Sequence, residues 1–174
     1  MNRSRTLVAA LVLSASGFGG WLASEGFTDR PMIPTQGDVP TIGYGSTRYE
    51  DGTPVTLADP AITRQRAEQL ARSLHEEEER RFRASLPGVK LFQEEYDLYL
   101  DFSGQYGGGN WRKPKSPRTW LLKGDYAGAC DALLNWRFAA GYDCSTLVNG
   151  KPNKRCWGVW TRQLERHAKC WSVQ

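Results

Sequence analysis

The sequence has few of the residues on which most nucleophilic, metal and nucleotide sites depend. It contains two histidines, His75 and His167, and its four cysteines form none of the Cys-x-x-Cys pairs that are typical of zinc sites. It also lacks a glycine-rich phosphate-binding motif followed by Lys-Ser or Lys-Thr. We therefore expect no metal, nucleotide or other cofactor, and no catalytic relay of the Ser/His/Asp or Cys/His kind.

The sequence also lacks a large excess of charge of either sign. Its 174 residues include 23 Lys and Arg against 19 Asp and Glu, which gives a net charge of +4 and a pI near 8.9. The length suits one domain, and 40% hydrophobic residues are enough to build a core. This composition excludes disordered, collagen-like and multi-span membrane proteins. The mild positive charge favours an acidic partner, such as nucleic acid, anionic lipid or bacterial cell wall.

Charge is absent altogether from residues 6–24, which follow Arg3 and Arg5. As a helix this segment would span about 28 Å, close to the thickness of the hydrocarbon core of a bilayer. It is either a signal peptide cleaved near Ser14-Ala15-Ser16 or an uncleaved anchor, which its ten Ala, Ser or Gly residues make weakly apolar. Both interpretations predict an export segment at residues 1–24 and a globular domain at residues 25–174, outside the cytoplasm, where the cysteines can form two disulfides.

The rest of the chain has a pattern of short strands followed by helices. Glycine turns are expected to join two strands at residues 41–45 and 50–53, and Asp59-Pro60 is expected to open a helix that runs past Phe82. The run of acids and bases at residues 76–83 is typical of a solvated helix face. Further helices are predicted over residues 92–102, before the glycines at 107–109, and over residues 119–123, 126–138 and 159–169. The predicted fold is α+β: a small antiparallel sheet and a mainly helical lobe, preceded by an apolar N-terminal helix.

Four motifs, in this order and spacing, resemble those of phage endolysins of the lysozyme type, glycoside hydrolase family 24. They are Ser24-Glu25-Gly26 after the apolar segment, Thr41-Ile42-Gly43-Tyr44-Gly45, Gly124-Asp125-Tyr126-Ala127-Gly128-Ala129-Cys130-Asp131 and Gly158-Val159-Trp160-Thr161-Arg162. The apolar segment is similar to that of the signal-anchor-release (SAR) members of the family. The resemblance implies a lysozyme-like fold and a muramidase that hydrolyses the β-1,4 bond between N-acetylmuramic acid and N-acetylglucosamine in peptidoglycan, which causes host cell lysis.

The resemblance also places the general acid on Glu25 and a catalytic threonine on Thr41. Glycoside hydrolysis needs a protonated carboxyl beside the leaving oxygen and, for inversion, a group that orients water on the opposite face of the sugar. We expect burial at the junction of helix and sheet to keep the Glu25 carboxyl protonated, and the Thr41 hydroxyl to orient the water.

The aspartate of the family is missing from its usual place. Counted from the glutamate, the spacing points to Pro34, and counted from the threonine it points to Thr35; neither is acidic. The nearest carboxylates are Asp38 and Asp29. Asp38 is the third catalytic candidate, provided that the loop at residues 34–40 turns its side chain inward, and Thr35 is the alternative. The family's Asn in the second-helix motif is likewise replaced, here by Gln105.

The resemblance favours Cys130 with Cys170 and Cys144 with Cys156 as the disulfide pairs. It implies a monomer that binds peptidoglycan glycan strands and no nucleic acid. It further implies a tether to the inner membrane of a Gram-negative host through residues 6–24, followed by release into the periplasm. While the tether holds, Glu25 would be fixed at the lipid surface and the enzyme would be idle.

Two other functions stay open at this point. A lytic transglycosylase would need Glu25 alone and would leave an anhydro sugar, which the absent aspartate permits. A non-enzymatic exported protein would bind glycan strands through its aromatic residues, among them seven Trp and seven Tyr, and through the basic loop at residues 111–118.

Overall fold

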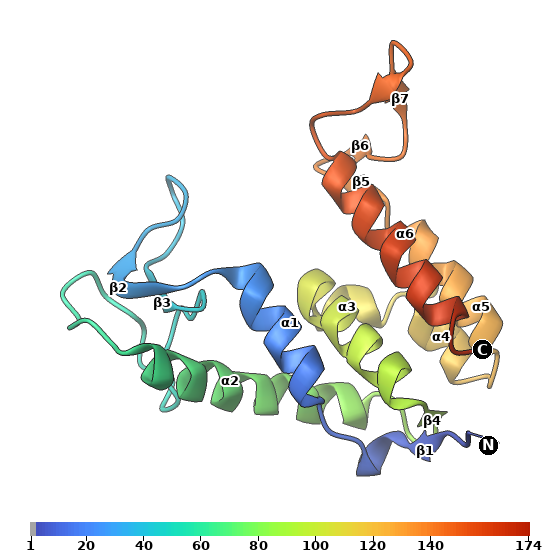
Figure 1. The fold of residues 1–174 in the computed structure, drawn as a ribbon, viewed down its shortest axis with the longest axis horizontal. Coiled ribbons are helices and arrows are strands. Elements are labelled where there is room, and N and C mark those ends of the chain that lie inside the picture. The colour runs from blue at the N-terminus through green and yellow to red at the C-terminus, as the bar shows by residue number, and fades with distance from the viewer. Residues whose placement is uncertain (1–2) are drawn as a thin grey trace. The chain divides into compact units, whose positions relative to one another are not determined.

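The computed structural model describes residues 3–174, apart from the side chain of Ser24 (Figure 1). The chain divides into two compact units. The sheet unit comprises Leu13–Arg81, and the helical unit comprises the residues before Leu13 together with Phe82–Gln174. The long helix α2 (Arg64–Ala84) begins in the sheet unit and ends in the helical unit.

The sheet unit is built from helix α1 (Ala15–Glu25), strands β2 (Thr28–Met32) and β3 (Thr41–Gly43), and most of α2. The strands pair antiparallel, with Thr28 opposite Gly43 and Met32 opposite Thr41, and the register is irregular between these pairs. Gly43 allows the sheet to approach α2 closely, because a Cβ there would stand 2.9 Å from the Cβ of Ala67. The core comprises two clusters, whose buried members are Phe18, Tyr44, Ala67 and Ala71 in one and Ile42, Val55 and Leu70 in the other.

The helical unit packs its helices around large aromatic side chains. Its elements are β1 (Thr6–Leu7), the 3-10 turn η1 (Val8–Ala10), β4 (Lys90–Leu91), α3 (Gln93–Trp111), α4 (Pro117–Leu121), α5 (Tyr126–Ala132), the 3-10 turn η2 (Leu133–Asn135) and α6 (Trp157–Trp171). β1 pairs antiparallel with β4. Fully buried side chains include Trp111, Tyr96, Tyr99, Phe102, Leu121 and Leu133.

Two short hairpins stand between α5 and α6. Strand β5 (Phe138–Ala139) pairs with β6 (Tyr142–Asp143), and β7 (Leu147–Val148) pairs with β8 (Lys151–Pro152). Both disulfides lie in this half of the unit: Cys130–Cys170 joins α5 to α6, and Cys144–Cys156 closes a loop around the second hairpin. The disulfide pairing that the sequence favoured is therefore confirmed.

The prediction of one apolar helix over residues 6–24 is wrong for this folded state. The segment forms β1, η1, a short linker and then α1, which begins after Ser14, whose Oγ accepts a hydrogen bond of 3.0 Å from the Gly17 amide. Three of its larger side chains are buried in the protein, namely Val8 at 0%, Leu11 at 8% and Phe18 at 5% exposed, whereas Leu7 and Val12 are exposed. Among the described residues, no helix combines the length and the apolar character needed to cross a bilayer.

The expected partner strand at residues 50–53 is also wrong. That stretch is a turn in which the Gly52 amide donates to the Tyr49 carbonyl at 3.0 Å, and β2 is the actual partner of β3. Asp59 does not cap α2, because its carboxylate accepts hydrogen bonds from Thr56 and Tyr49 in a preceding turn. The predicted helices are present as α3 to α6, although α5 is shorter than expected. The glycine run does not end α3, which continues to Trp111 with a non-helical residue at Gly107 (φ 77°, ψ 153°).

The charged run on α2 is only partly a solvated face. Glu77 forms exposed ion pairs with Arg81 and Arg48, as expected for such a run. Glu79, in contrast, is 7% exposed, and its carboxylate accepts a hydrogen bond of 2.7 Å from the Leu13 amide. A glutamate in this run therefore helps to hold the linker before α1.

Candidate active site

Glu25 is the last residue of α1, and the chain turns sharply after it. Gly26 has a φ of 73°, a conformation that favours glycine, and it leads directly into β2. A Cβ on Gly45 would stand 3.4 Å from the Glu25 Oε2, so the carboxylate lies against the turn that follows β3. Glu25 is exposed, and the expected burial of this carboxyl is therefore not found.

Thr41 begins the strand that leads into the same turn. It pairs with Met32 of β2, and its hydroxyl donates a 3.4 Å hydrogen bond to the Met32 carbonyl. Ile42 and Ser46 exchange two backbone hydrogen bonds of 3.0 Å, which close the turn around Gly45. The sheet unit thus places the Glu25 carboxylate and the Thr41 hydroxyl at one short strand and its turn.

A cluster of three side chains holds this turn to the end of α1. The Arg64 guanidinium donates to the Tyr44 hydroxyl at 2.9 Å and lies 4.4 Å from the centre of the Phe27 ring. Phe27 and Tyr44 are themselves in contact, with ring centres 5.6 Å apart. Arg64 was not recognised from the sequence, where it stands among other charged residues at the start of α2. The glycine-flanked Tyr44 was the only hint of the cluster.

The candidate aspartates lie elsewhere in the sheet unit. Asp38 is exposed in the loop between β2 and β3, where its Oδ1 accepts from the Val39 amide at 2.9 Å and its own amide donates to the Thr35 carbonyl. Asp29 is exposed on β2, and its carbonyl accepts from the Ile62 amide. Asp38 and Thr35 therefore share a turn, and both side chains are solvent-exposed.

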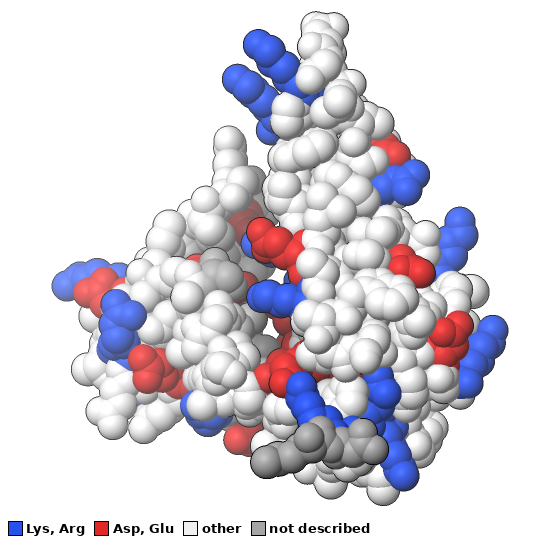
Figure 2. All heavy atoms as spheres, turned by 45° about the vertical axis from the view of Figure 1, so that its right-hand side comes forward, with Lys and Arg blue, Asp and Glu red and all other residues white. Residues whose placement is uncertain are grey.

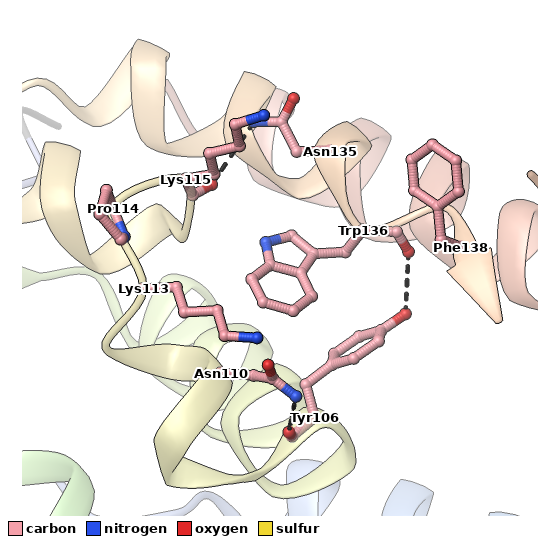
Figure 3. Close-up of a pocket in the computed structure, with 8 residues that line it drawn as sticks. All are labelled: Tyr106, Asn110, Lys113, Pro114, Lys115, Asn135, Trp136 and Phe138. Atoms are coloured by element: carbon pink, nitrogen blue, oxygen red, sulfur yellow. Dashed lines mark hydrogen bonds between the residues drawn. The ribbon is translucent and has the colours of Figure 1, made fainter. Parts of the chain in front are cut away.

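The helical unit contains a separate cavity of about 570 Å³. Its lining is Tyr106, Asn110, Lys113, Pro114, Lys115, Asn135, Trp136 and Phe138 (Figure 3). The indole of Trp136 extends toward the loop that carries Lys113 and Lys115. The basic loop and the aromatic residues noted in the sequence thus meet in one place. Gln105, the replacement for the family's Asn, is exposed on α3 and is not part of this lining.

Two polar groups of this cavity, the Tyr106 hydroxyl and the Trp136 Nε1, differ in their hydrogen bonding. The Tyr106 hydroxyl donates to the Trp136 carbonyl at 3.1 Å and accepts from Gln163, while burial raises the pKa of Tyr106. The Trp136 Nε1, in contrast, is buried and has no hydrogen-bond partner among the described residues. An unsatisfied buried donor beside a cavity is a natural contact for a ligand oxygen.

The described residues include no group of three or more His, Cys, Asp or Glu side chains arranged to hold a metal ion. His167 instead forms a pair with Asp131, at 3.0 Å between Nε2 and Oδ1, which lowers the pKa of Asp131. Because 36 residues separate them, this pair was not visible in the sequence.

Comparison with known proteins gives a family and a fold. The model of the family described as phage lysozyme matches residues 23–155. An endolysin from the Escherichia coli O157:H7 phage FAHEc1 is 22% identical with a TM-score of 0.71, over 95% of this chain and 96% of that one. A mutant of P22 lysozyme is 23% identical with a TM-score of 0.70, over 92% and 99%. The active form of the P1 phage endolysin Lyz is 15% identical with a TM-score of 0.68, over 99% and 97%. A search of curated protein sequences finds no significant match.

Proposed function

The chain belongs to the phage lysozyme family and is a lysozyme-type glycoside hydrolase with a lysozyme-like fold, and we propose that it lyses the host cell by hydrolysing peptidoglycan. The bond cut is the β-1,4 linkage between N-acetylmuramic acid and N-acetylglucosamine. One observation carries the proposal: the Glu25 carboxylate lies against the turn of the strand that Thr41 begins.

Glu25 acts as the general acid in this proposal. Its proton passes to the glycosidic oxygen as the bond from that oxygen to the anomeric carbon breaks. The exposed position of Glu25 makes its carboxyl accessible to a bound glycan, and the sugar rings then supply the burial that favours the protonated form. The cluster of Arg64, Tyr44 and Phe27 positions the turn beneath the carboxylate.

Thr41 orients the attacking water. A hydroxyl has one proton to donate, and Thr41 directs it to the Met32 carbonyl. The oxygen lone pairs then remain to accept a hydrogen bond from a water molecule. In the inverting reaction this water attacks the anomeric carbon from the face opposite the leaving group. Asp38 is the candidate base, and it must leave its turn with Val39 to take the proton from the water.

The cavity of the helical unit contributes to substrate binding. The face of Trp136 suits a sugar ring, and Lys113 and Lys115 suit the carboxylates of peptidoglycan. The unpartnered Trp136 Nε1 supplies a donor for a ligand oxygen. The same features support the non-enzymatic function of glycan binding, but here they serve a hydrolase.

A lytic transglycosylase remains the second candidate. It is favoured by the turn that holds Asp38, because a reaction that uses Glu25 alone needs no base to activate water. Mass spectrometry of the products from purified peptidoglycan separates the two reactions. Hydrolysis gives reducing ends, and transglycosylation gives anhydro products that are lighter by one water molecule. Exclusively anhydro products would reject the hydrolytic proposal.

We further propose that the protein is a monomer that is tethered before it acts. In the tethered state residues 6–24 cross the inner membrane as a weakly apolar helix, with Arg3 and Arg5 on the cytoplasmic side. Glu25 is then fixed at the lipid surface, and α1 and the turn at Gly45 cannot assemble around it. Loss of the membrane potential, which acts on charges near the ends of the segment, promotes release into the periplasm.

Fractionation of cells before and after addition of an uncoupler tests the tether. The full-length chain should move from the membrane to the soluble fraction as lysis begins. A variant with Gly17, Gly19 and Gly20 replaced by Leu should stay in the membrane and delay lysis, because Leu inserts into lipid more favourably than Gly. A soluble protein that is already shortened before the uncoupler is added would identify a cleaved signal peptide instead.

A further inference from the structure

The two hairpins between α5 and α6 expose an unusual concentration of large apolar side chains. Phe138 is 55% exposed, Tyr142 45%, Leu147 58% and Val148 55%, all within eleven consecutive residues. Solvent-exposed apolar residues are ordinary when they are scattered singly, whereas a local cluster indicates a surface that contacts something.

The same region is positively charged. Lys151, Lys154 and Arg155 are exposed, and the sequence contains no Asp or Glu from residue 144 to residue 164. The nearest acid, Asp143, is paired with Arg137 at 3.0 Å. Figure 2 shows Lys and Arg side chains projecting from the end of the helical unit that carries β7 in Figure 1.

The exposed side chains stand on an ordered framework. The disulfide Cys144–Cys156 encloses the hairpin of β7 and β8, and Asn149 and Gly150 turn between these strands with φ of 52° and 71°. Positive φ at both central residues is the geometry of a tight hairpin turn that Asn-Gly favours. Leu147 and Val148 are therefore held at the tip by the backbone, beside the cations.

We propose that the disulfide-enclosed loop, residues 144–156, docks on the surface of an anionic phospholipid bilayer. Leu147 and Val148 insert at the boundary between head groups and acyl chains, and Lys151, Lys154 and Arg155 contact the lipid phosphates. Adjacent aliphatic and cationic side chains, without an acid between them, are what an interface of this kind requires. A glycan strand would instead contact aromatic ring faces, and residues 144–156 contain no aromatic residue. The exposed rings of Phe138 and Tyr142 lie in the preceding hairpin, outside this loop.

This docking is independent of the glycosidic reaction. The N-terminal segment has already folded into the protein in this structure, with Val8 fully buried, so it does not hold the folded enzyme to lipid. The loop would keep the folded enzyme at a membrane surface by a reversible and salt-sensitive contact.

Co-sedimentation of the full-length protein with vesicles tests the proposal. Vesicles of phosphatidylcholine with phosphatidylglycerol should retain the protein, pure phosphatidylcholine should retain about tenfold less, and high salt should release it. Two variants probe the loop: L147S/V148S at the tip, and K151Q/K154Q/R155Q in the cations. Each should lower the retained fraction about tenfold while leaving thermal unfolding unchanged.

Matched controls separate the loop from general surface properties. L57S/L122S removes two other exposed leucines, at 59% and 41%, and K90Q/K123Q/K169Q removes the same charge elsewhere on the helical unit. Both controls should bind like the unaltered protein. The proposal is overturned if the loop variants and the controls bind equally, if charge-free vesicles bind as well as anionic ones, or if the loop variants lose retention on purified peptidoglycan sacculi but keep it on vesicles.

Discussion

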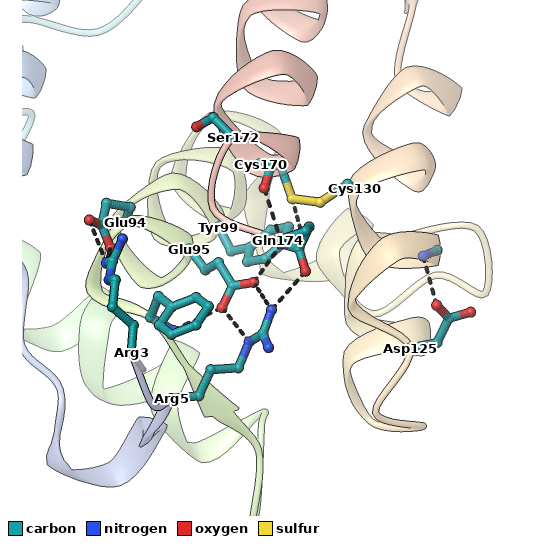
Figure 4. Close-up of polar contacts among 12 residues, drawn as sticks. Arg3, Arg5, Glu94, Glu95, Tyr99, Asp125, Cys130, Cys170, Ser172 and Gln174 are labelled. Carbon is teal, nitrogen blue, oxygen red and sulfur yellow. Dashed lines mark hydrogen bonds and ion pairs between the residues drawn. A yellow bond between two sulfur atoms is a disulfide. The ribbon is translucent and has the colours of Figure 1, made fainter. Parts of the chain in front are cut away.

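Arg5 and Glu95 form an ion pair with two hydrogen bonds across 90 residues of sequence, at 2.9 Å from Nε to Oε2 and 2.8 Å from Nη2 to Oε1 (Figure 4). The Glu95 side chain is 0% exposed, and the hydrogen bond to Glu95 raises the pKa of Arg5. The guanidinium also lies 3.7 Å from the centre of the Tyr126 ring. The buried carboxylate at the start of α3 therefore depends on a residue from the very beginning of the chain.

Replacing Arg5 by Gln should destabilise the helical unit by about 2 to 4 kcal/mol, because it leaves the buried Glu95 carboxylate without its cationic partner and, among the described residues, with only the Phe92 amide and the Gln174 side chain as donors. Arg3 provides the control: its pair with Glu94 is exposed, at 55% and 53%, so R3Q should lower stability by less than about 1 kcal/mol. Urea unfolding of both variants measures the difference. If both variants lose the same small amount of stability, the Glu95 carboxylate does not depend on Arg5.

The same pair links stability to the proposed tether. A chain whose residues 6–24 cross a bilayer cannot place Arg5 against Glu95. The helical unit would then reach its full stability only after release, and R5Q should slow the appearance of soluble protein after an uncoupler is added. If R5Q is released at the rate of the unaltered protein, the Arg5–Glu95 ion pair does not contribute to release from the membrane.

Gly45 provides a direct probe of the space around Glu25. In G45A the new Cβ would stand 3.4 Å from the Glu25 Oε2, and the φ of 78° adds strain of about 1 kcal/mol. We expect kcat to fall about 10- to 100-fold because the carboxylate is displaced. Gly52 is the matched control, since its φ is 86° but a Cβ there meets no atom within 4 Å. G52A should lose similar stability and keep its kcat; equal kcat values for the two variants would argue against the proposed position of the acid.

Thr41 and Asp38 should respond differently to substitution. T41A removes the hydroxyl that orients water and should lower kcat about 100-fold, whereas T41S should retain much of the activity. D38N should have a milder effect if the carboxylate stays in its turn with Val39. Steady-state kinetics on solubilised peptidoglycan compares them. A loss in D38N as large as in T41A would assign Asp38 the role of the base.

The Glu50–Arg66 ion pair gives a pH-dependent contribution to stability. Hydrogen bonds from Arg66, at 2.5 and 2.8 Å, lower the pKa of Glu50 from its usual 4.5. The folded state thus favours the ionised carboxyl, so its contribution is present at neutral pH and disappears as the pH falls below 4.5. Since the pair is partly exposed, E50Q should destabilise by about 0.2 to 1 kcal/mol at pH 7. Urea unfolding at pH 7 and pH 3 should show the difference only at the higher pH; a loss that persists at pH 3 would indicate a packing effect.

The sequence predicted the helical part of the fold well because its helices have periodic apolar positions and clear ends. The apolar positions of α3 and of α6 are local signals, and the structure confirms both helices. The expected end of α3 at the glycine run is wrong, because the helix continues to Trp111 with Gly107 alone in a non-helical conformation. Strand β2 was missed because residues 28–32 contain a proline and no alternation of apolar and polar residues, and their pairing with β3 depends on contacts distant in sequence.

The N-terminal segment and the candidate site both depend on tertiary contacts, which local sequence patterns do not predict. Residues 6–24 are compatible with a membrane helix, but in the folded protein tertiary contacts divide them between two cores, through Val8 in one unit and Phe18 in the other. The sequence motifs were enough to select Glu25 and Thr41 as catalytic candidates. The support from Arg64 and the unpartnered Trp136 Nε1 depends on side chains brought together by the fold, which no spacing in the sequence reveals.

The rate at which purified E25Q clears chloroform-treated Gram-negative cells tests the central claim most directly. If Glu25 donates the proton to the leaving oxygen, E25Q should unfold at the same temperature as the unaltered protein and lyse the cells about 10² to 10⁴ times more slowly. E76Q, which alters an exposed glutamate on α2, should lyse at the normal rate. A folded E25Q that clears the cells as fast as the unaltered protein would contradict the assignment of Glu25 as the general acid.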